Sequence, residues 1–265
     1  MSVSTGSNEA TGPGTGPRSG IGSPPADVAS LVARYLEAFT SLATAGETGL
    51  YLAGSPALGD LSPRQSNIDL VAVTEAPLPD GVLRQLSRVH RSLRLNGRDA
   101  AVCYTTWDGL KLASGDPAAT VYEGASVVAS DRLSNPVTWA ILSDHPVAFH
   151  GRSAPVVRSE PDLVKAWFAA QLPSIAERAG SLLWRRQLTR VVLQATRAGH
   201  AVLTGEVVSL RRAAELALPT ASHTSHRVLT DALGYREGAN TSMYWGPFER
   251  KANASTLTRD LLRLV

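Results

Sequence analysis

Two short runs of sequence decide the fold: Leu50-Tyr51-Leu52-Ala53-Gly54-Ser55 and, after a polar gap, Asn67-Ile68-Asp69-Leu70-Val71. Both runs are apolar and have the length of a buried strand, and the gap between them is rich in turn-forming residues. The first strand therefore delivers Gly54 and Ser55 at its end. The second begins with Asn67 and Asp69, which the alternation of side chains along a strand places on one face.

This arrangement predicts a nucleotide site. Glycine at the end of a strand lets a phosphate approach the backbone, and the hydroxyl of Ser55 adds a hydrogen bond. Oxygen ligands one residue apart on the next strand, at Asn67 and Asp69, are placed to hold magnesium, which would bridge the phosphates and stabilise an in-line displacement. The plainer alternatives are a simple turn at Gly54 and a carboxylate at Asp69 that only accepts backbone hydrogen bonds.

Outward from these runs, the pattern predicts helices at residues 27–45 and 83–95 and a third strand at residues 99–105. Strands separated by helices indicate an α/β layer. Residues 107–128 show no clear period, and residues 136–150 read as a helix followed by a short strand. The sequence thus predicts a sheet-containing first half.

The second half, from residue 159 to the end, is predicted to be helical. The clearest stripe of apolar residues runs over residues 184–203, and Gly205 is placed to end that helix. Ser209 is placed to cap the next helix, which should stop at Pro219. We therefore expect a tail at residues 1–26, a first domain at residues 27–153 and a helical domain at residues 154–265.

Composition excludes several classes of protein. Cys103 is the only cysteine, so an intrachain disulfide and a cysteine-built zinc site are both impossible, and a cytoplasmic location is expected. Residues 1–26 are rich in Ser, Gly, Pro and Thr without an apolar stretch, which indicates a disordered tail rather than a secretory signal. No apolar run has the length of a membrane span.

The charge balance favours a small anionic ligand over nucleic acid. The net charge is +3 and the pI is near 9.2, too mild to indicate a nucleic-acid partner. Trp184-Arg185-Arg186 is better explained by a helix with a buried tryptophan and a solvated basic face, because no repeated interleaving of aromatic and basic residues accompanies it. Trp139 and Trp245 are further candidates for core anchors.

The first motif, Ala53-Gly54-Ser55 with Ile68-Asp69-Leu70, resembles the signature of the nucleotidyltransferase superfamily. The second half resembles the helical domain of aminoglycoside adenylyltransferases of the streptomycin and spectinomycin type, through Arg197-Ala198-Gly199, the stretch from Leu203 to Ser209, and Arg211-Arg212-Ala213-Ala214-Glu215. The resemblance implies an α/β (α+β) nucleotidyltransferase-like domain with a mixed sheet, followed by a C-terminal helical bundle. It also implies that ATP and a small hydroxylated acceptor meet between the two.

The chain departs from that family at three chemical positions. Asn67 stands where the family has its first metal-binding carboxylate, and Ala101 aligns with a third carboxylate, for which Asp99 is a possible substitute as metal ligand or base. Leu210 stands where the family has a phosphate-contacting lysine, and Arg211 or Arg212 beside it could take over that contact.

Three hypotheses follow from these residues. The first is an active nucleotidyltransferase that moves AMP from a nucleoside triphosphate, with Asp69 and Asp99 as catalytic residues, Gly54, Ser55, Arg211 and Arg212 binding nucleotide, and Asp69 with Asn67 holding a weakly bound Mg2+. The second is a degenerate pseudoenzyme that binds nucleotide or a small molecule without turnover. The third is an interaction protein that retains only the architecture.

Overall fold

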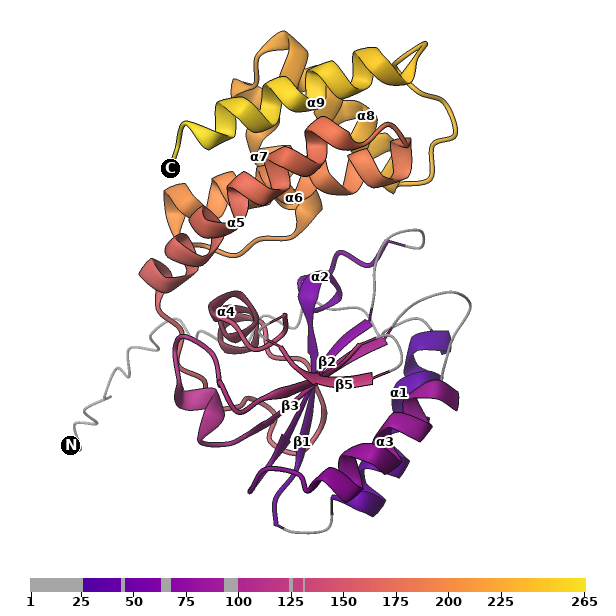
Figure 1. The fold of residues 1–265 in the computed structure, drawn as a ribbon, viewed down its shortest axis with the longest axis vertical. Coiled ribbons are helices and arrows are strands. Elements are labelled where there is room, and N and C mark those ends of the chain that lie inside the picture. The colour runs from indigo at the N-terminus through magenta and orange to yellow at the C-terminus, as the bar shows by residue number, and fades with distance from the viewer. Residues whose placement is uncertain (1–25, 44–45, 63–67, 93–99, 124–125, 131) are drawn as a thin grey trace, which may run out of the picture.

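The structure, a computed structural model, describes residues 26–43, 46–62, 68–92, 100–123, 126–130 and 132–265. The expected tail up to residue 25 lies outside the described residues, as do Asn67 and Asp99. Within the described part, the chain forms a sheet-containing half and a helical half (Figure 1).

The first half is built on a six-stranded mixed sheet with the order β5-β4-β3-β2-β1-β6. The central pair, β2 and β3, is parallel, and the other neighbouring strands are antiparallel. The strand bounds are β1 Gly49–Ala53, β2 Ile68–Thr74, β3 Ala100–Thr106, β4 Thr120–Glu123, β5 Ser126–Ala129 and β6 Ala148–His150. The three expected strands are thus present at β1, β2 and β3. The segment without a clear period contains a one-turn 3-10 helix, Gly109–Lys111, and the short strands β4 and β5.

Helices cover both faces of this sheet. α1 (Ala26–Leu42) and α3 (Asp80–Ser92) lie side by side on one face (Figure 1). α4 (Pro136–Asp144) lies on the other face and also contacts the helical half. Alternation along the strands sorts the core: Leu50 and Leu52 belong to the cluster that contains α1, whereas Tyr51 and Ala53 pack with Trp139 of α4.

A buried polar group lies under α1 and α3. The Nε2 atom of His90 is 2.6 Å from the hydroxyl of Tyr104, and its ring stacks on Tyr122 with ring centroids 3.8 Å apart. Tyr35 donates a hydrogen bond of 3.0 Å to the same Tyr104 hydroxyl. Burial lowers the pKa of His90 to about 3, so this ring is neutral in the folded protein.

The second half is a bundle whose centre is α6 (Arg185–Thr204), against which α5 (Pro161–Ser181), α7 (Leu210–Ala217), α8 (His223–Arg236) and α9 (Pro247–Leu262) pack. Gly205 ends α6 at φ +76°, in the left-handed region that favours glycine. The side chain of Ser209 caps α7 by accepting a hydrogen bond from the Arg212 amide. Both expected helix ends are therefore confirmed. None of the described helices has the length and apolar character needed to cross a membrane.

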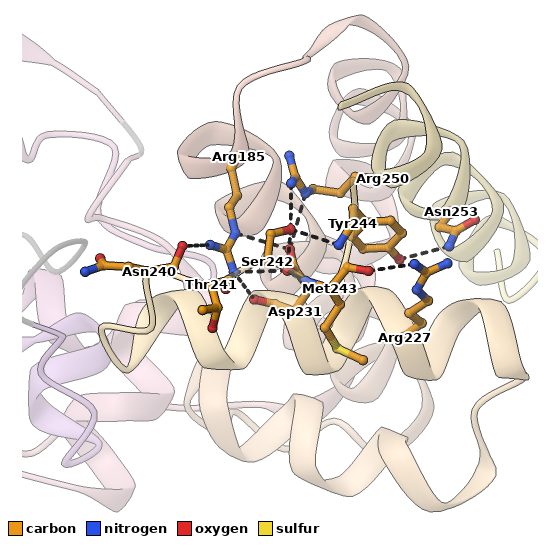
Figure 2. A network of polar contacts seen from close by, with 10 residues as sticks. All are labelled: Arg185, Arg227, Asp231, Asn240, Thr241, Ser242, Met243, Tyr244, Arg250 and Asn253. Atoms are coloured by element: carbon orange, nitrogen blue, oxygen red, sulfur yellow. Dashed lines mark hydrogen bonds and ion pairs between the residues drawn. The ribbon is translucent and has the colours of Figure 1, made fainter. Parts of the chain in front are cut away.

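The expectation of buried tryptophans holds for Trp139 alone. Trp139 is fully buried, but Trp184 is 77% exposed and Trp245 is completely exposed. Trp184 is exposed because the next residue, Arg185, points into the helical half instead. Arg185 forms a 3.0 Å ion pair with Asp231, which is 2% exposed and is also paired with Arg250 (Figure 2).

Candidate functional site

The site begins where β1 ends. Gly54 has φ +68° and opens the one-turn helix α2 (Gly54–Ala57). A Cβ atom at position 54 would lie 2.8 Å from Oδ2 of Asp69. Both this close approach and the positive φ therefore disfavour any residue other than glycine. The backbone of this turn therefore comes directly against the Asp69 carboxylate.

Asp69 lies between two small neighbours in the sheet. Its register partner on β1 is Ala53, and its partner on β3 is Ala101. The Oδ1 atom of Asp69 is buried and has no hydrogen-bond partner among the described residues. Burial raises the pKa of Asp69, and the charges of Arg132, Arg190 and Arg197 oppose that rise.

Helix α6 turns a polar face toward this carboxylate. Arg190, Gln194 and Arg197 are four and three residues apart, a spacing that places them on one side of a helix. Oε1 of Gln194 and Nε of Arg197 are both buried without a partner among the described residues. Burial lowers the pKa of Arg197 to about 10, so the guanidinium stays charged at neutral pH. Its Cζ atom lies 5.6 Å from the ring centroid of Phe168.

These groups line a cavity of about 230 Å³ between the two halves of the chain. Gly54, Ser55 and Asp69 line it from the sheet, and Arg132 with the start of α4 forms a second wall. The helical half contributes Trp167 of α5, the polar face of α6, and Leu210. The volume is somewhat below the roughly 300–1,000 Å³ of pockets that enclose a whole ligand, so the cavity suits one polar portion of a ligand.

Of the residues expected to bind nucleotide, Gly54 and Ser55 line the cavity, whereas Arg211 and Arg212 do not. Arg211 lies 2.7 Å from Glu215, and Arg212 lies 3.8 Å from the same residue; both arginine side chains are more than half exposed. Whether either one contacts a bound phosphate stays a prediction, which charge reversal at each position would test. Sequence reasoning did not single out Arg132, Arg190 or Gln194. The signal for the last two was the spacing of Arg190, Gln194 and Arg197, which places three polar side chains on one side of α6.

The described residues do not fit a dedicated magnesium site. Asp69 is the one acidic side chain among the described residues that line the cavity. Ala101 occupies the adjoining position on β3, so the neighbouring strand supplies no carboxylate there. No cluster of three His, Cys, Asp or Glu side chains able to hold a metal occurs in the described part of the chain. Magnesium sites rely on hard anionic oxygens, and three arginines surround this single carboxylate.

A buried ion pair joins the sheet-containing half to the helical half. Asp60, which follows α2, pairs with Arg236 of α8 at 2.9 Å, and the two side chains are 9% and 4% exposed. The same carboxylate accepts a 3.1 Å hydrogen bond from the backbone amide of Arg211, in the first turn of α7. Asp60 therefore joins the turn after Gly54 to two helices of the second half.

Comparison of the sequence with protein-family models and with curated proteins finds no match. Among solved structures, the chain is similar to the spectinomycin adenyltransferase AAD(9) from Enterococcus faecialis, whose crystal structure was determined with ATP and spectinomycin. The TM-score is 0.68 at 13% sequence identity, over 88% of this chain and 98% of that chain. The expected fold, an α/β nucleotidyltransferase-like half followed by a helical half, is thereby confirmed.

Proposed function

We propose that this protein binds a nucleoside triphosphate, with ATP as the first candidate, through phosphates held in the cavity between its halves, and that it transfers AMP to a hydroxyl group of a small molecule. The observation that carries the proposal is that Gly54, directly after β1, and Asp69, near the start of β2, line one cavity with the polar face of α6. The adenyltransferase that shares this fold was crystallised with ATP and spectinomycin, so an aminoglycoside is the first acceptor to test.

The reaction would be an in-line displacement at the α-phosphorus. The acceptor oxygen forms a bond to phosphorus while the bond from phosphorus to the β-phosphate oxygen breaks, which releases pyrophosphate. Asp69 is our candidate for the group that accepts the hydroxyl proton, because burial raises its pKa toward the range in which a carboxylate works as a base. The charges of Arg190 and Arg197 would stabilise the negative charge that develops on the leaving pyrophosphate.

Magnesium, if bound, would supply charge neutralisation in nucleotidyl transfer. The described lining residues do not form a site for it. A contribution from Asn67 or Asp99 as ligand or base stays a prediction that lies outside the described residues.

A second candidate function is nucleotide binding without turnover. The observation that favours it is the pair of apolar side chains at chemically important positions, Ala101 beside Asp69 and Leu210 in the cavity wall. With these residues the site would keep its ability to attract phosphates and lack two groups that the resembled enzymes use.

One experiment separates these functions. Purified protein is incubated with ATP labelled in the adenine ring and a panel of aminoglycosides, while calorimetry measures ATP binding separately. Adenylylated product with release of pyrophosphate supports transfer, and its loss in Asp69→Asn supports the assigned base. ATP binding without product across the panel supports the second candidate. Absence of ATP binding under all conditions contradicts both and leaves an interaction protein.

A further inference from the structure

The polar atoms that lack partners converge on one place. Five buried side-chain nitrogen or oxygen atoms have no hydrogen bond among the described residues, and three of them line the cavity: Oδ1 of Asp69, Oε1 of Gln194 and Nε of Arg197. Buried polar groups are nearly always satisfied in folded proteins, so a concentration of unsatisfied ones indicates a missing ligand. Two of the three atoms are acceptors, whereas Nε of Arg197 is a donor on a permanent cation and calls for an anionic acceptor.

The charge of the cavity indicates the sign of that ligand. Arg132, Arg190 and Arg197 contribute three positive charges and Asp69 one negative charge, which gives +2 for the described lining residues at neutral pH. Arg190 takes part in no hydrogen bond or ion pair with the rest of the described chain, and its side chain is exposed. A dication entering before the nucleotide would meet net repulsion here, whereas a polyphosphate would meet net attraction.

The geometry of α6 suits a chain of phosphates. Arg190 and Arg197 are seven residues apart, or about 10 Å along the helix axis, and Gln194 lies between them on the same face. Guanidinium groups match phosphate oxygens with two parallel hydrogen bonds. The ring of Phe168 supports the guanidinium of Arg197 from one side. Two arginines thus present donors along one wall, with the side chain of Gln194 between them.

We propose that the cavity binds the phosphates of its nucleotide through Arg190, Arg197 and Arg132 directly, and that this binding does not require a divalent cation. The arginine charges would neutralise the phosphates, which is what magnesium does in enzymes that bind it through carboxylates. This inference rests on the proposed nucleotide binding, and it differs from that proposal by specifying which positive charges hold the phosphates.

The first test is titration calorimetry of the full chain with ATP in excess magnesium and, separately, in EDTA, with inorganic tripolyphosphate as a second probe. We expect the dissociation constant for ATP in EDTA to lie within about threefold of that in magnesium, and tripolyphosphate to compete. Binding that is at least about tenfold weaker in EDTA overturns the inference and leaves nucleotide binding standing. Absence of ATP binding in both buffers overturns the inference and the proposed function together.

Substitution of Asp69 gives results of opposite sign for the two modes of binding. If arginines alone hold the phosphates, Asp69→Asn removes a repelling charge and should tighten ATP binding by about threefold or more in magnesium as well as in EDTA. If Asp69 holds a magnesium ion that bridges to the nucleotide, the same variant should weaken binding in magnesium, although the repulsion is relieved in EDTA in this mode too. The second pattern contradicts the inference.

Substitution of the arginines completes the test. Arg190→Met should weaken metal-free ATP binding about tenfold, because charge-assisted hydrogen bonds to phosphate are lost. Arg178→Met is the matched control: Arg178 is also an exposed helix arginine, on α5, and it does not line the cavity. Arg197→Met tests the buried position, with the melting temperature recorded to verify folding. Equal affinities in Arg190→Met and Arg178→Met contradict the assignment.

Discussion

The ion pair between Asp60 and Arg236 joins the halves of the chain, and Asp60→Asn tests what it contributes. Asparagine has nearly the same shape as aspartate, so the variant removes charge without opening a cavity. It leaves the Arg236 guanidinium, 4% exposed, without a counter-ion at 2.9 Å. It also weakens the acceptor of the Arg211 amide at the start of α7, where a negative charge is favourable.

The expected loss is large for a single substitution. Removal of one partner of a buried ion pair costs about 3–5 kcal/mol, and we expect about 3 kcal/mol because asparagine keeps one oxygen as an acceptor. At about 2–4 °C per kcal/mol for a chain of this size, the melting temperature should fall by about 6–12 °C. ATP affinity should fall as well, because Asp60 holds the turn after Gly54 against the helices that complete the cavity.

Urea unfolding followed by circular dichroism measures the free energy of unfolding, and calorimetry measures ATP binding. Asp260→Asn is the control, since its pair with Arg263 is solvent-exposed, with side chains 46% and 75% exposed. That variant should lose less than about 1 kcal/mol. The reasoning is refuted if Asp60→Asn is destabilised no more than the control, or if it is strongly destabilised while the folded fraction binds ATP with unchanged affinity.

Three further predictions concern single positions. Gly54→Ala should lower ATP affinity more than tenfold in a folded protein, because φ is +68° and the new methyl group would lie 2.8 Å from Asp69 Oδ2; unchanged affinity by calorimetry would exclude close phosphate approach at Gly54. Burial lowers the pKa of His90 from 6.5 to about 3 in the folded protein. Between these two pH values the unfolded state carries a proton on His90 that the folded state does not, so stability falls on acidification, by about 2 kcal/mol from pH 7 to pH 5. His90→Phe should flatten that part of the urea-unfolding pH profile, and an unaltered profile would contradict the assignment. Asp231→Asn leaves Arg185 and Arg250 without their shared counter-ion (Figure 2) and should destabilise the protein by about 3–5 kcal/mol; a melting temperature within a few degrees of the parent would refute it.

Local patterns in the sequence determined much of the fold. The apolar runs ending at Ala53 and beginning at Ile68 became neighbouring strands of one sheet. The apolar stripe before Gly205 became a helix that ends at that glycine, and Ser209 caps the next one. These features depend on side-chain periodicity and on backbone conformations that few residues adopt, so they can be read without knowledge of distant contacts.

Short and irregular elements were outside the reach of such patterns. β4 and β5 are four residues each, too few to establish a period, and their pairing partners lie elsewhere in the sheet. Trp184 and Trp245 were expected in the core, yet both are exposed. Burial depends on which face of an element meets a neighbour, and the charge on Asp231 draws Arg185 inward instead of Trp184.

For the candidate site too, the sequence indicated some residues and only the tertiary structure showed the others. The sequence by itself placed Gly54, Ser55 and Asp69 together, because the end of the first strand and the start of the second were expected to lie side by side in one sheet. It selected Arg211 and Arg212 of α7 as phosphate contacts and did not single out Arg190 of α6, although both helices carry arginines. That choice depends on the rotation and docking of each helix against the sheet, which packing across the whole molecule fixes: Arg190 and Arg197 line the cavity, while Arg211 pairs with Glu215 outside it.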